Sequence, residues 1–258
     1  MKKVGLALSG GGARGFAHVG VLKGLVENDV PIDLIAGTSA GSFVGGAFAA
    51  GMSVNEIVEV GKQISWFGVA GFSYSPKGFL SNAAMKSFIE KSFPVSRFED
   101  LRIPFTAVAC DLETGEEIYL KDEGDLTHAI RASCAIPGVF IPVTDDGRQL
   151  VDGGVVSPIP TRAVKKMGAE VIIAVDLMTS GPINWGVPST LVGTFFQSAM
   201  IMLRTTSRNQ HYRANVILEP AIGHIRPDDI SKRDELIELG YDSVVKSLDK
   251  IKEALGSN

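Results

Sequence analysis

Cysteine is scarce in this chain of 258 residues, and its two cysteines, Cys110 and Cys134, form no C-x-x-C pair. Cysteine and histidine spacings typical of metal ligands are also missing, so the sequence predicts no metal site. So few cysteines favour a reduced, cytoplasmic protein over a secreted one that is held by disulfides. We interpret Cys134 as a core residue rather than a nucleophile.

Long hydrophobic segments that target or anchor a chain are lacking as well. The first apolar run extends only from Val4 to Leu8, which is too short for the core of a signal peptide. The 21 residues from Leu34 to Val54 carry no charge, but glycines interrupt them repeatedly. A buried strand, turn and helix therefore fit this segment better than a membrane span. We expect no transmembrane segment and a cytoplasmic protein that is able to contact a membrane surface transiently.

Positive charge is not in excess, because the formal net charge is −4 and no basic cluster with interleaved aromatics stands out. Nucleic acid is therefore not an expected partner. No internal repeat or low-complexity stretch is present either.

What is present is an alternation of strand-like and helix-like segments, in a chain long enough to bury a large core. This order predicts an α/β fold with three layers, in which helices cover both faces of a mostly parallel central sheet. We expect one domain over residues 1–258, with a helical C-terminal portion at about 189–256. The expected strands are 3–9, 34–36, 103–109, 171–177 and 215–218, and the expected helices include 14–28, 41–50 and 82–93.

A serine stands in a sequence context that is typical of a nucleophile. The pentapeptide Gly37-Thr38-Ser39-Ala40-Gly41 follows the apolar run 34–36 and precedes a helix of small residues. A G-x-S-x-G sequence between a strand and a helix predicts a tight turn that holds the hydroxyl clear of the backbone. The pentapeptide is also compatible with an ordinary glycine-rich turn, so it does not decide the question alone.

A second glycine-rich segment, Gly10-Gly11-Gly12-Ala13-Arg14-Gly15, joins the first expected strand to the first expected helix. That helix places Phe16, Val19, Leu22 and Val26 on one face. A glycine loop that leads into a helix presents backbone N–H groups in a concave array, which binds negative charge. The segment therefore predicts either an oxyanion hole or a phosphate site.

The phosphate interpretation is the weaker of the two. Gly10, Gly12 and Gly15 satisfy the G-x-G-x-x-G pattern, which also requires an acidic residue at the far end of the next strand. Asp33 precedes that strand instead, and Thr38 and Ser39 occupy the required place. The G-K-[ST] sequence of a mononucleotide loop is missing too. We therefore favour an oxyanion hole and expect no nucleotide cofactor.

A third motif, Asp152-Gly153-Gly154, follows the strand-like residues 149–151. An aspartate at the end of a strand can be held against another backbone segment by the glycines that follow. Asp-Gly is also a common turn dipeptide, so this motif is weak by itself.

In this order, the motifs resemble those of the patatin-like phospholipase family. The segment 10–15 is similar to that family's oxyanion motif, 37–41 to its nucleophile elbow, and 152–154 to its D-G-[AG] motif. The segment 132–142, Ala-Ser-Cys-Ala-Ile-Pro-Gly-Val-Phe-Ile-Pro, is similar to the stretch that the family carries ahead of the aspartate. Order and spacing agree over about residues 3–180.

The resemblance implies a serine lipid acyl hydrolase of the phospholipase, lysophospholipase or carboxylesterase type, which uses a Ser–Asp dyad. Ser39 would attack an ester carbonyl, and Asp152 would accept the proton of its hydroxyl. Amides of Gly11 and Gly12, with Ala13 or Ala40 as further candidates, would bind the oxyanion. The expected substrate is a lipid or a fatty ester, and neither a metal nor an organic cofactor is implied.

Two other functions stay open at this stage. His211 and His224 follow Asp152 in the sequence, which is the order of a conventional Ser-His-Asp esterase. We interpret His211, however, as part of a solvated face. A patatin-like chain with a mainly regulatory or binding role is the other alternative. Arg14 either binds a lipid phosphate or fixes the loop by a salt bridge, and we favour the second role.

Two further expectations concern substrate access and the C-terminus. Residues 66–80 gather five aromatics among glycines and serines, and this segment or 181–188 is a candidate lid. Ser231-x-x-Asp234 resembles a capping box. The apolar residues that follow it have helical spacing and predict one continuous stripe that covers the sheet. They are Ile237, Tyr241, Val244, Leu248, Ile251 and Leu255.

Overall fold

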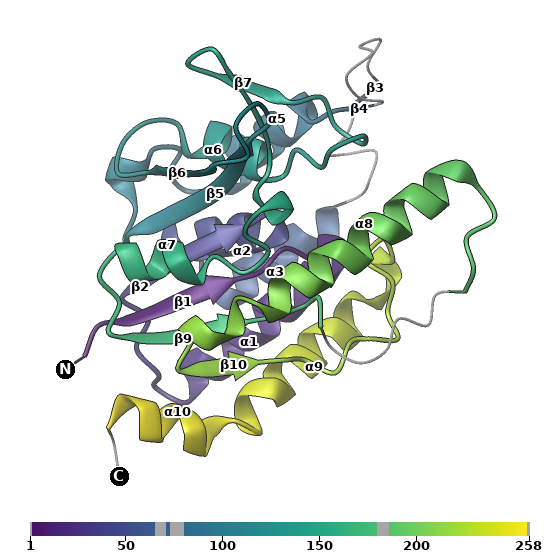
Figure 1. Ribbon diagram of the computed structural model, residues 1–258. Helices are drawn as coiled ribbons and strands as arrows, with labels where there is room; N and C mark the ends of the chain where they lie inside the picture. The colour runs from purple at the N-terminus through teal and green to yellow at the C-terminus, as the bar shows by residue number, and fades with distance from the viewer. Residues whose placement is uncertain (1, 65–70, 73–79, 180–185, 257–258) are drawn as a thin grey trace.

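The computed structural model describes residues 2–64, 71–72, 80–179 and 186–256. Within these residues the main sheet has eight strands in the order β10-β9-β1-β2-β5-β8-β7, and β6 pairs with β5 (Figure 1). Its strands are β1 (Val4–Leu8), β2 (Leu34–Thr38), β5 (Phe105–Asp111), β6 (Glu117–Lys121), β7 (Val143–Asp145), β8 (Arg148–Asp152), β9 (Val171–Val175) and β10 (Val216–Leu218). A separate antiparallel pair is formed by β3 (Gly71–Phe72) and β4 (Leu80–Ser81).

The strand directions confirm a mostly parallel sheet. β10, β9, β1, β2 and β5 are parallel neighbours, whereas β6, β8 and β7 join antiparallel to β5 or to one another. The five strands expected from the sequence correspond to β1, β2, β5, β9 and β10, with ends that differ by at most two residues. β6 and β7 were not expected, because their residues are only partly buried and lack a continuous apolar run.

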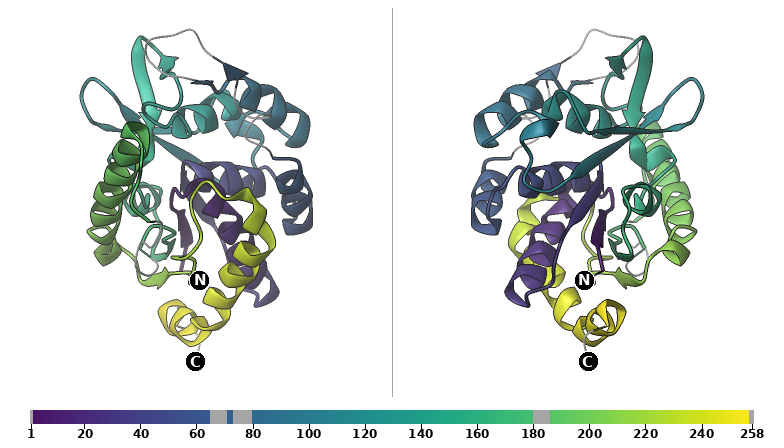
Figure 2. Two further views of the ribbon diagram at one scale, coloured as in Figure 1. Left: turned by 90° about the vertical axis from the view of Figure 1, so that its right-hand side faces the viewer. Right: turned by 90° about the vertical axis from the view of Figure 1, so that its left-hand side faces the viewer.

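Helices cover both faces of the sheet, which makes three layers (Figures 1 and 2). On one face, Leu6, Leu8 and Ile35 belong to the large hydrophobic core beneath the helices. On the other face, the smaller side chains of Ala7 and Ala36 contact a short helix. The helices are α1 (Phe16–Glu27), α2 (Ala40–Ala49), α3 (Val54–Gln63), α5 (Ala83–Ser92), α6 (Leu126–Ser133), α7 (Thr161–Lys166), α8 (Leu191–Arg208), α9 (Arg233–Val245) and α10 (Leu248–Leu255).

Different helices cover the two faces of the sheet. α1, α2 and α6 lie on the face with the large core, and α3, α5 and α9 lie beyond them. α7 and α8 lie on the opposite side, as Figure 2 shows. α7 approaches the sheet closely, because a Cβ atom on Gly5 would lie 2.0 Å from Val164 Cγ1. None of the helices in the described part of the chain is long and apolar enough to cross a bilayer.

The first helix begins later than its sequence predicts. Gly12–Gly15 forms a turn of 3₁₀ helix, and α1 starts at Phe16 rather than at Arg14. The expected apolar face holds for Phe16, Val19 and Leu22, which are buried, but Val26 in the last turn is 48% exposed. Because of this 3₁₀ turn, the glycine-rich segment 10–15 ends before the regular α-helix begins.

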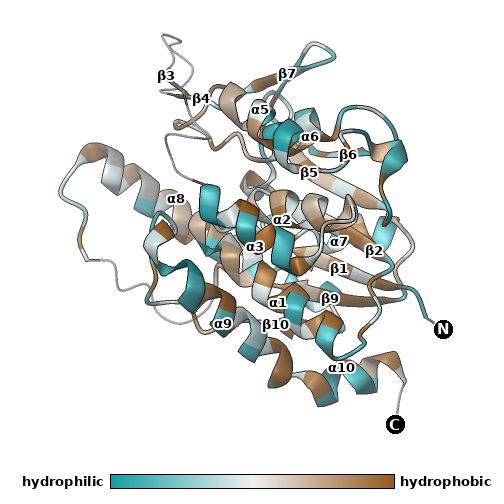
Figure 3. Ribbon diagram, turned by 180° about the vertical axis from the view of Figure 1, so that it is seen from behind, coloured by the Kyte–Doolittle hydropathy of each residue, from teal (hydrophilic) through white to brown (hydrophobic). Residues whose placement is uncertain are grey.

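The C-terminal segment forms two helices instead of one continuous stripe, because the chain turns between α9 and α10. α9 contacts α1 rather than the sheet, and the two backbones touch. A Cβ atom on Gly20 would lie 1.9 Å from the Ile237 carbonyl oxygen, and one on Gly240 would lie 2.0 Å from the Ala17 carbonyl oxygen. The alternation of hydrophobic and hydrophilic residues along α9 and α10 can be followed in Figure 3.

The expected capping box at Ser231 does not form. The Asp229 side chain accepts hydrogen bonds from the Ser231 amide and hydroxyl, and α9 starts at Arg233. Of the two candidate lids, most of 66–80 and the first part of 181–188 lie outside the described residues.

Candidate active site

A change of partner along one edge of β5 brings Ser39 and Asp152 together. β2 pairs with this edge up to Thr38, which lies opposite Val108. β8 takes over at the next residue, where Asp152 lies opposite Ala109. Because β6 occupies the other edge of β5, the end of β2 and the end of β8 meet at this point. Residues 113 positions apart in sequence thereby become neighbours.

Ser39 occupies the tight turn that its sequence predicts. Its φ and ψ angles are 52° and −122°, a strained conformation for a residue with a side chain. Both flanking glycines are required by close contacts. A Cβ atom on Gly37 would lie 2.4 Å from the Gly41 carbonyl oxygen, and one on Gly41 would lie 2.2 Å from the Leu8 carbonyl oxygen. The start of α2 therefore lies against the backbone of both β2 and β1.

The Ser133 hydroxyl links the turn at Ser39 to the sheet. The Ser39 amide donates to Ser133 Oγ at 2.9 Å, and Ser133 Oγ donates to the Val108 carbonyl at 2.6 Å. Ser133 ends α6 and is fully buried. One feature of the sequence pointed to this residue, its place in the segment 132–142, but nothing there predicts this contact.

The Asp152 carboxyl group is buried at the same junction and is only 7% exposed. It accepts a hydrogen bond from the Gly154 amide at 2.7 Å, and the Ser39 side chain lies near enough to influence its pKa. Burial raises the pKa of Asp152 to about 6, although Ser39 and the Gly154 amide act in the opposite direction. Gly153 fits close to β5, because a Cβ atom there would lie 2.2 Å from the Val108 carbonyl oxygen.

Three amides of the segment 10–15 are already engaged in hydrogen bonds. The Gly10 amide donates to the Pro158 carbonyl at 3.0 Å and the Ala13 amide to the Pro227 carbonyl at 2.7 Å. The Arg14 amide donates to a carbonyl within the loop at 3.2 Å. These three amides, including that of Ala13, are therefore occupied in this structure.

The amides of Gly11 and Gly12 donate to no other group within the part of the chain that the structure describes. Gly12 lines the same cavity as Ser39 and has a φ angle of +58°. A Cβ atom on Gly12 would lie 2.5 Å from the Pro227 carbonyl oxygen, so both backbone angle and space require glycine. Gly15 lies close to Ala40, the residue after Ser39, because a Cβ atom on Gly15 would lie 2.7 Å from Ala40 Cβ.

An apolar cavity of about 140 Å³ opens beside Ser39. Side chains from α1, α2, α3 and α5 line it, together with the segment 134–140 and Ile230. The lining residues are Gly12, Ala13, Gly15, Phe16, Val19, Ser39, Ala40, Phe43, Val44, Ile57, Gly61, Ile64, Met85, Cys134, Ile136, Phe140 and Ile230. Almost all of these present hydrocarbon, so the cavity suits an apolar chain attached to a reacting group at Ser39.

Comparison with known proteins agrees with these features. The family model of patatin-like phospholipases matches residues 6–165, which contain the glycine loop, the Ser39 turn and Asp152. This chain belongs to the patatin-like phospholipase family. The resemblance seen in the sequence motifs is thereby confirmed.

Relatives in this family come from bacteria and eukaryotes. An uncharacterised NTE family protein of Mycobacterium tuberculosis is 39% identical over 192 residues, which cover 72% of this chain and 53% of that protein. Lysophospholipase NTE1 of Yarrowia lipolytica is 33% identical over 71% of this chain and 13% of its own length. This chain thus spans about half of the mycobacterial relative and a small part of the yeast one.

Solved structures show the same fold. The crystal structure of VipD from Legionella pneumophila superposes with a TM-score of 0.58 at 13% identity, covering 96% of this chain and 67% of that one. The type III effector protein ExoU superposes with a TM-score of 0.50 at 12% identity, covering 97% and 53%. The patatin-like α/β fold expected from the sequence is therefore confirmed.

Arg14 holds the glycine loop of this patatin-like site in place. Its guanidinium group is only 2% exposed and donates to the carbonyls of Leu177, Gly223 and Ile225. Burial lowers the pKa of Arg14 to about 10, with a smaller contribution from Arg204. The structural role that we favoured fits this geometry, in which backbone carbonyls accept the hydrogen bonds of the guanidinium group.

The Cys134 thiol lines the cavity without the character of a nucleophile. It is buried, and burial raises its pKa to about 12. A thiol with such a pKa stays protonated at neutral pH. Cys134 is therefore a core residue, as expected from the sequence.

All four histidines bond groups other than Ser39. Their Nε2 atoms lie 2.7–3.0 Å from other partners: His18 from the Ser9 carbonyl, His128 from Asp145, His211 from Asp176 and His224 from Glu235. His18 is fully buried, and burial lowers its pKa to about 4. The Ser39 side chain instead neighbours Asp152 and acts to lower the pKa of that carboxyl group.

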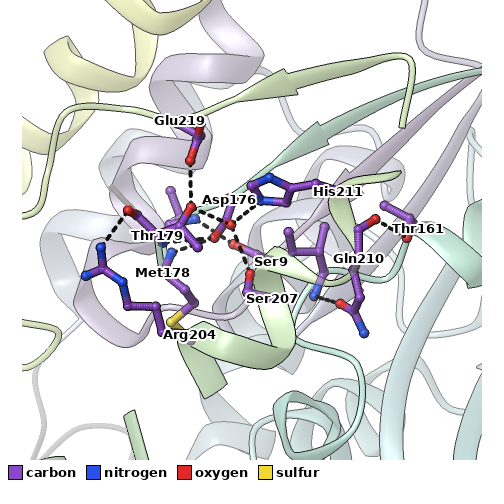
Figure 4. A network of polar contacts seen from close by, with 12 residues as sticks. Ser9, Thr161, Asp176, Met178, Thr179, Arg204, Ser207, Gln210, His211 and Glu219 are labelled. Carbon is purple, nitrogen blue, oxygen red and sulfur yellow. Dashed lines mark hydrogen bonds and ion pairs between the residues drawn. The ribbon is translucent and has the colours of Figure 1, made fainter. Parts of the chain in front are cut away.

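The interpretation of His211 as part of a solvated face is wrong. Its ring belongs to a network around the buried Asp176, which also accepts hydrogen bonds from Thr179 and Ser207 (Figure 4). The hydrogen bond to Asp176 raises the pKa of His211. Burial acts to raise the pKa of Asp176, but its hydrogen bonds outweigh burial and leave it below the usual value.

This network also contains a grouping that the sequence spacing did not predict. Donor atoms of Asp176, His211 and Glu219 lie within 4.8 Å of one another. Both Asp176 oxygens already accept hydrogen bonds, so the group acts as a structural link between β9 and the end of α8. The link reaches the glycine loop as well, because the Leu177 amide donates to Ser9 Oγ at 3.0 Å.

Proposed function

We propose that this chain hydrolyses carboxylic esters of lipids, with Ser39 as the nucleophile and Asp152 as the general base. The observation that carries the proposal is the buried Asp152 carboxyl group, which lies next to the Ser39 side chain at the junction of β2 and β8 and has a pKa raised to about 6. A general base works best when its pKa lies near the operating pH. An aspartate at its usual pKa of about 3.9 is a poor acceptor for a hydroxyl proton.

In the first step, Ser39 Oγ attacks the ester carbonyl carbon while its proton passes to the Asp152 carboxylate. The strained turn and the Ser133 hydroxyl hold the Ser39 backbone at the end of β2. The amides of Gly11 and Gly12 bind the oxyanion of the tetrahedral intermediate. Donors of this kind contribute about 10²–10³ in rate each.

In the second step, the protonated Asp152 donates its proton to the leaving alcohol oxygen as the bond from acyl carbon to that oxygen breaks. The acyl group stays on Ser39 as an ester. Water then attacks the acyl carbon while Asp152 takes a proton from that water, and the fatty acid leaves as Ser39 regains its proton. The buried carboxyl group can serve in both directions because its pKa lies close to neutral pH.

The substrate class follows from the cavity beside Ser39. Its hydrocarbon lining suits an acyl chain, and the names of the family and of the yeast lysophospholipase support a lipid ester. A cavity of about 150 Å³ in another protein holds one benzene molecule, so the enclosed part here holds about six carbon atoms. We infer that the rest of a longer acyl chain extends toward solvent or a lipid surface.

Ester hydrolysis by five proteins tests this proposal: wild type, Ser39→Ala, Asp152→Asn, His211→Asn and His224→Asn. Nitrophenyl esters of increasing chain length and a lysophospholipid serve as substrates. We expect Ser39→Ala and Asp152→Asn to lose nearly all activity, while both histidine variants retain it. Collapse of activity in one histidine variant would indicate a Ser-His-Asp enzyme instead. A wild type without activity on every ester would favour a regulatory or binding role.

A further inference from the structure

The outer face of α8 presents large hydrophobic side chains to solvent. Leu191 is 87% exposed, Phe195 65% and Met202 64%. Positions 191, 195 and 202 fall within about 40° of one another around a helix. Val187, in the loop before the helix, is 95% exposed. We call these four residues the α8 apolar face. Monomeric soluble proteins rarely expose such a row without an interaction partner.

The place of α8 in the fold leaves this face uncovered. The Leu191 end of the helix projects from the rest of the chain in views from the front and from behind (Figures 1 and 3). The other end is fixed, because Ser207 donates to Asp176 and Arg204 donates to the Thr179 carbonyl. α8 is thus a helix held at one end, with its apolar face directed away from the sheet.

The charge pattern around α8 fits a lipid surface. Residues 177–203 contain no charged side chain and no histidine, and the charges of α8 are Arg204 and Arg208 alone. The helix therefore carries positive charge and no carboxylate, in a chain whose net charge is −4. Arg204 bonds the Thr179 carbonyl, whereas Arg208 is exposed and lies about 120° around the helix from the middle of the apolar face. Helices that lie in the interface of a membrane combine a hydrophobic face with basic residues on the polar face, where acidic lipids attract them.

The α8 apolar face is also continuous with the cavity beside Ser39. The Phe195 ring lies 3.9 Å from the position that a Cβ atom on Gly138 would occupy. Gly138 is exposed, and its neighbours Ile136 and Phe140 line the cavity. A lipid surface in contact with α8 would therefore lie next to the residues that receive the acyl chain.

We propose that the α8 apolar face docks this protein on the surface of a phospholipid bilayer, an inference that extends the proposed function by assigning where its lipid substrate is met. The α8 axis lies along the interface, with Leu191 and Phe195 at the level of the first acyl carbons. Arg208, which is exposed at the end of the helix, lies among the lipid phosphates. Docking places the segment 136–140 against the bilayer.

Sedimentation with sucrose-loaded vesicles tests this docking without reference to catalysis. The probe is a vesicle of phosphatidylcholine and phosphatidylglycerol, and the variant is Leu191→Glu with Met202→Glu. Both positions are exposed, and glutamate is a good helix former, so the fold is expected to persist. The matched control is Val26→Glu with Val245→Glu, which adds the same charge at positions that are 48% and 45% exposed elsewhere.

We expect the α8 variant to lose at least about tenfold in its partition coefficient, while the control loses much less. Hydrolysis of a short, soluble ester is expected to be unchanged in both. Equal vesicle binding by wild type and the α8 variant would overturn the proposal. So would a wild-type dimer that the α8 variant dissociates without a change in vesicle binding, because the face would then be a contact between two copies.

The two proposals fail in different ways. Vesicle binding through α8 by a chain that hydrolyses no ester would support docking and refute the proposed function. Hydrolysis of soluble esters by a chain that binds no vesicle would support the function and refute docking.

Discussion

Lowering the pH from about 7 to about 5 is expected to slow ester hydrolysis about tenfold, because Asp152 must be ionised to act as the base. Burial raises the pKa of this carboxyl group to about 6. About nine tenths of the molecules then carry the carboxylate at pH 7, and about one tenth at pH 5. With the ordinary pKa of 3.8, the rate would change by only about 6% over this range.

The assay is kcat/KM for a short nitrophenyl ester in buffers of constant ionic strength, since this parameter reports ionisation of the free enzyme. A soluble ester removes any effect of pH on vesicle binding. Circular dichroism at each pH establishes that the fold persists. His211→Asn serves as the control, because histidine is the other side chain that ordinarily titrates near neutral pH, and the hydrogen bond to Asp176 raises the pKa of His211.

We expect wild type and His211→Asn to share one inflection near pH 6, with activity lost on the acidic side. A flat profile from about pH 5 to 8 would show that burial does not raise the pKa of the base as argued. An inflection that disappears in His211→Asn would assign the base to histidine.

Three further predictions concern single residues. Asp152→Asn is expected to stabilise the fold at pH 7 by up to about 3 kcal/mol in chemical denaturation, because ionising a carboxyl group whose pKa is raised in the folded state is unfavourable. The gain should vanish below about pH 4, where the unfolded chain also protonates, and a gain that persists there would refute the reasoning. Ser133→Ala is expected to lower kcat about tenfold or more, because it removes the hydrogen-bond acceptor of the Ser39 amide. The pH inflection is expected to stay unchanged, because the surroundings of the Asp152 carboxyl group are not altered. An unchanged kcat would refute the positioning role of Ser133. Gly12→Ala is expected to lower kcat by at least about 10²-fold, because the new Cβ atom meets the Pro227 carbonyl and displaces an oxyanion donor; wild-type kcat would exclude that donor.

The glycine motifs made much of the site predictable from the sequence. Gly37 and Gly41 lie where the backbone leaves no room for a side chain beside the turn at Ser39, and Gly153 lies equally close to β5. Such constraints are local, so a short motif records them. The alternation of apolar runs and helical segments likewise predicted the parallel part of the sheet.

Contacts between distant segments could not be predicted in the same way. Nothing in the pattern of β8 indicates that it continues the edge of β5 where β2 ends, although this register joins Ser39 to Asp152. The Ser133 bridge and the network around Asp176 depend on the same long-range arrangement. The exposure of the α8 apolar face could not be predicted either, because the sequence of an uncharged helix indicates burial unless the neighbouring elements are known.

Labelling with a fluorophosphonate, followed by peptide mass spectrometry, tests the Ser39–Asp152 dyad most directly. The reagent forms a stable adduct with a serine that acts as a nucleophile. We predict a single adduct on Ser39 that appears as hydrolysis stops, much slower labelling of Asp152→Asn, and neither adduct nor turnover in Ser39→Ala. Turnover that survives in Ser39→Ala, or inactivation with the adduct on another residue, would contradict the assignment of Ser39 as the nucleophile.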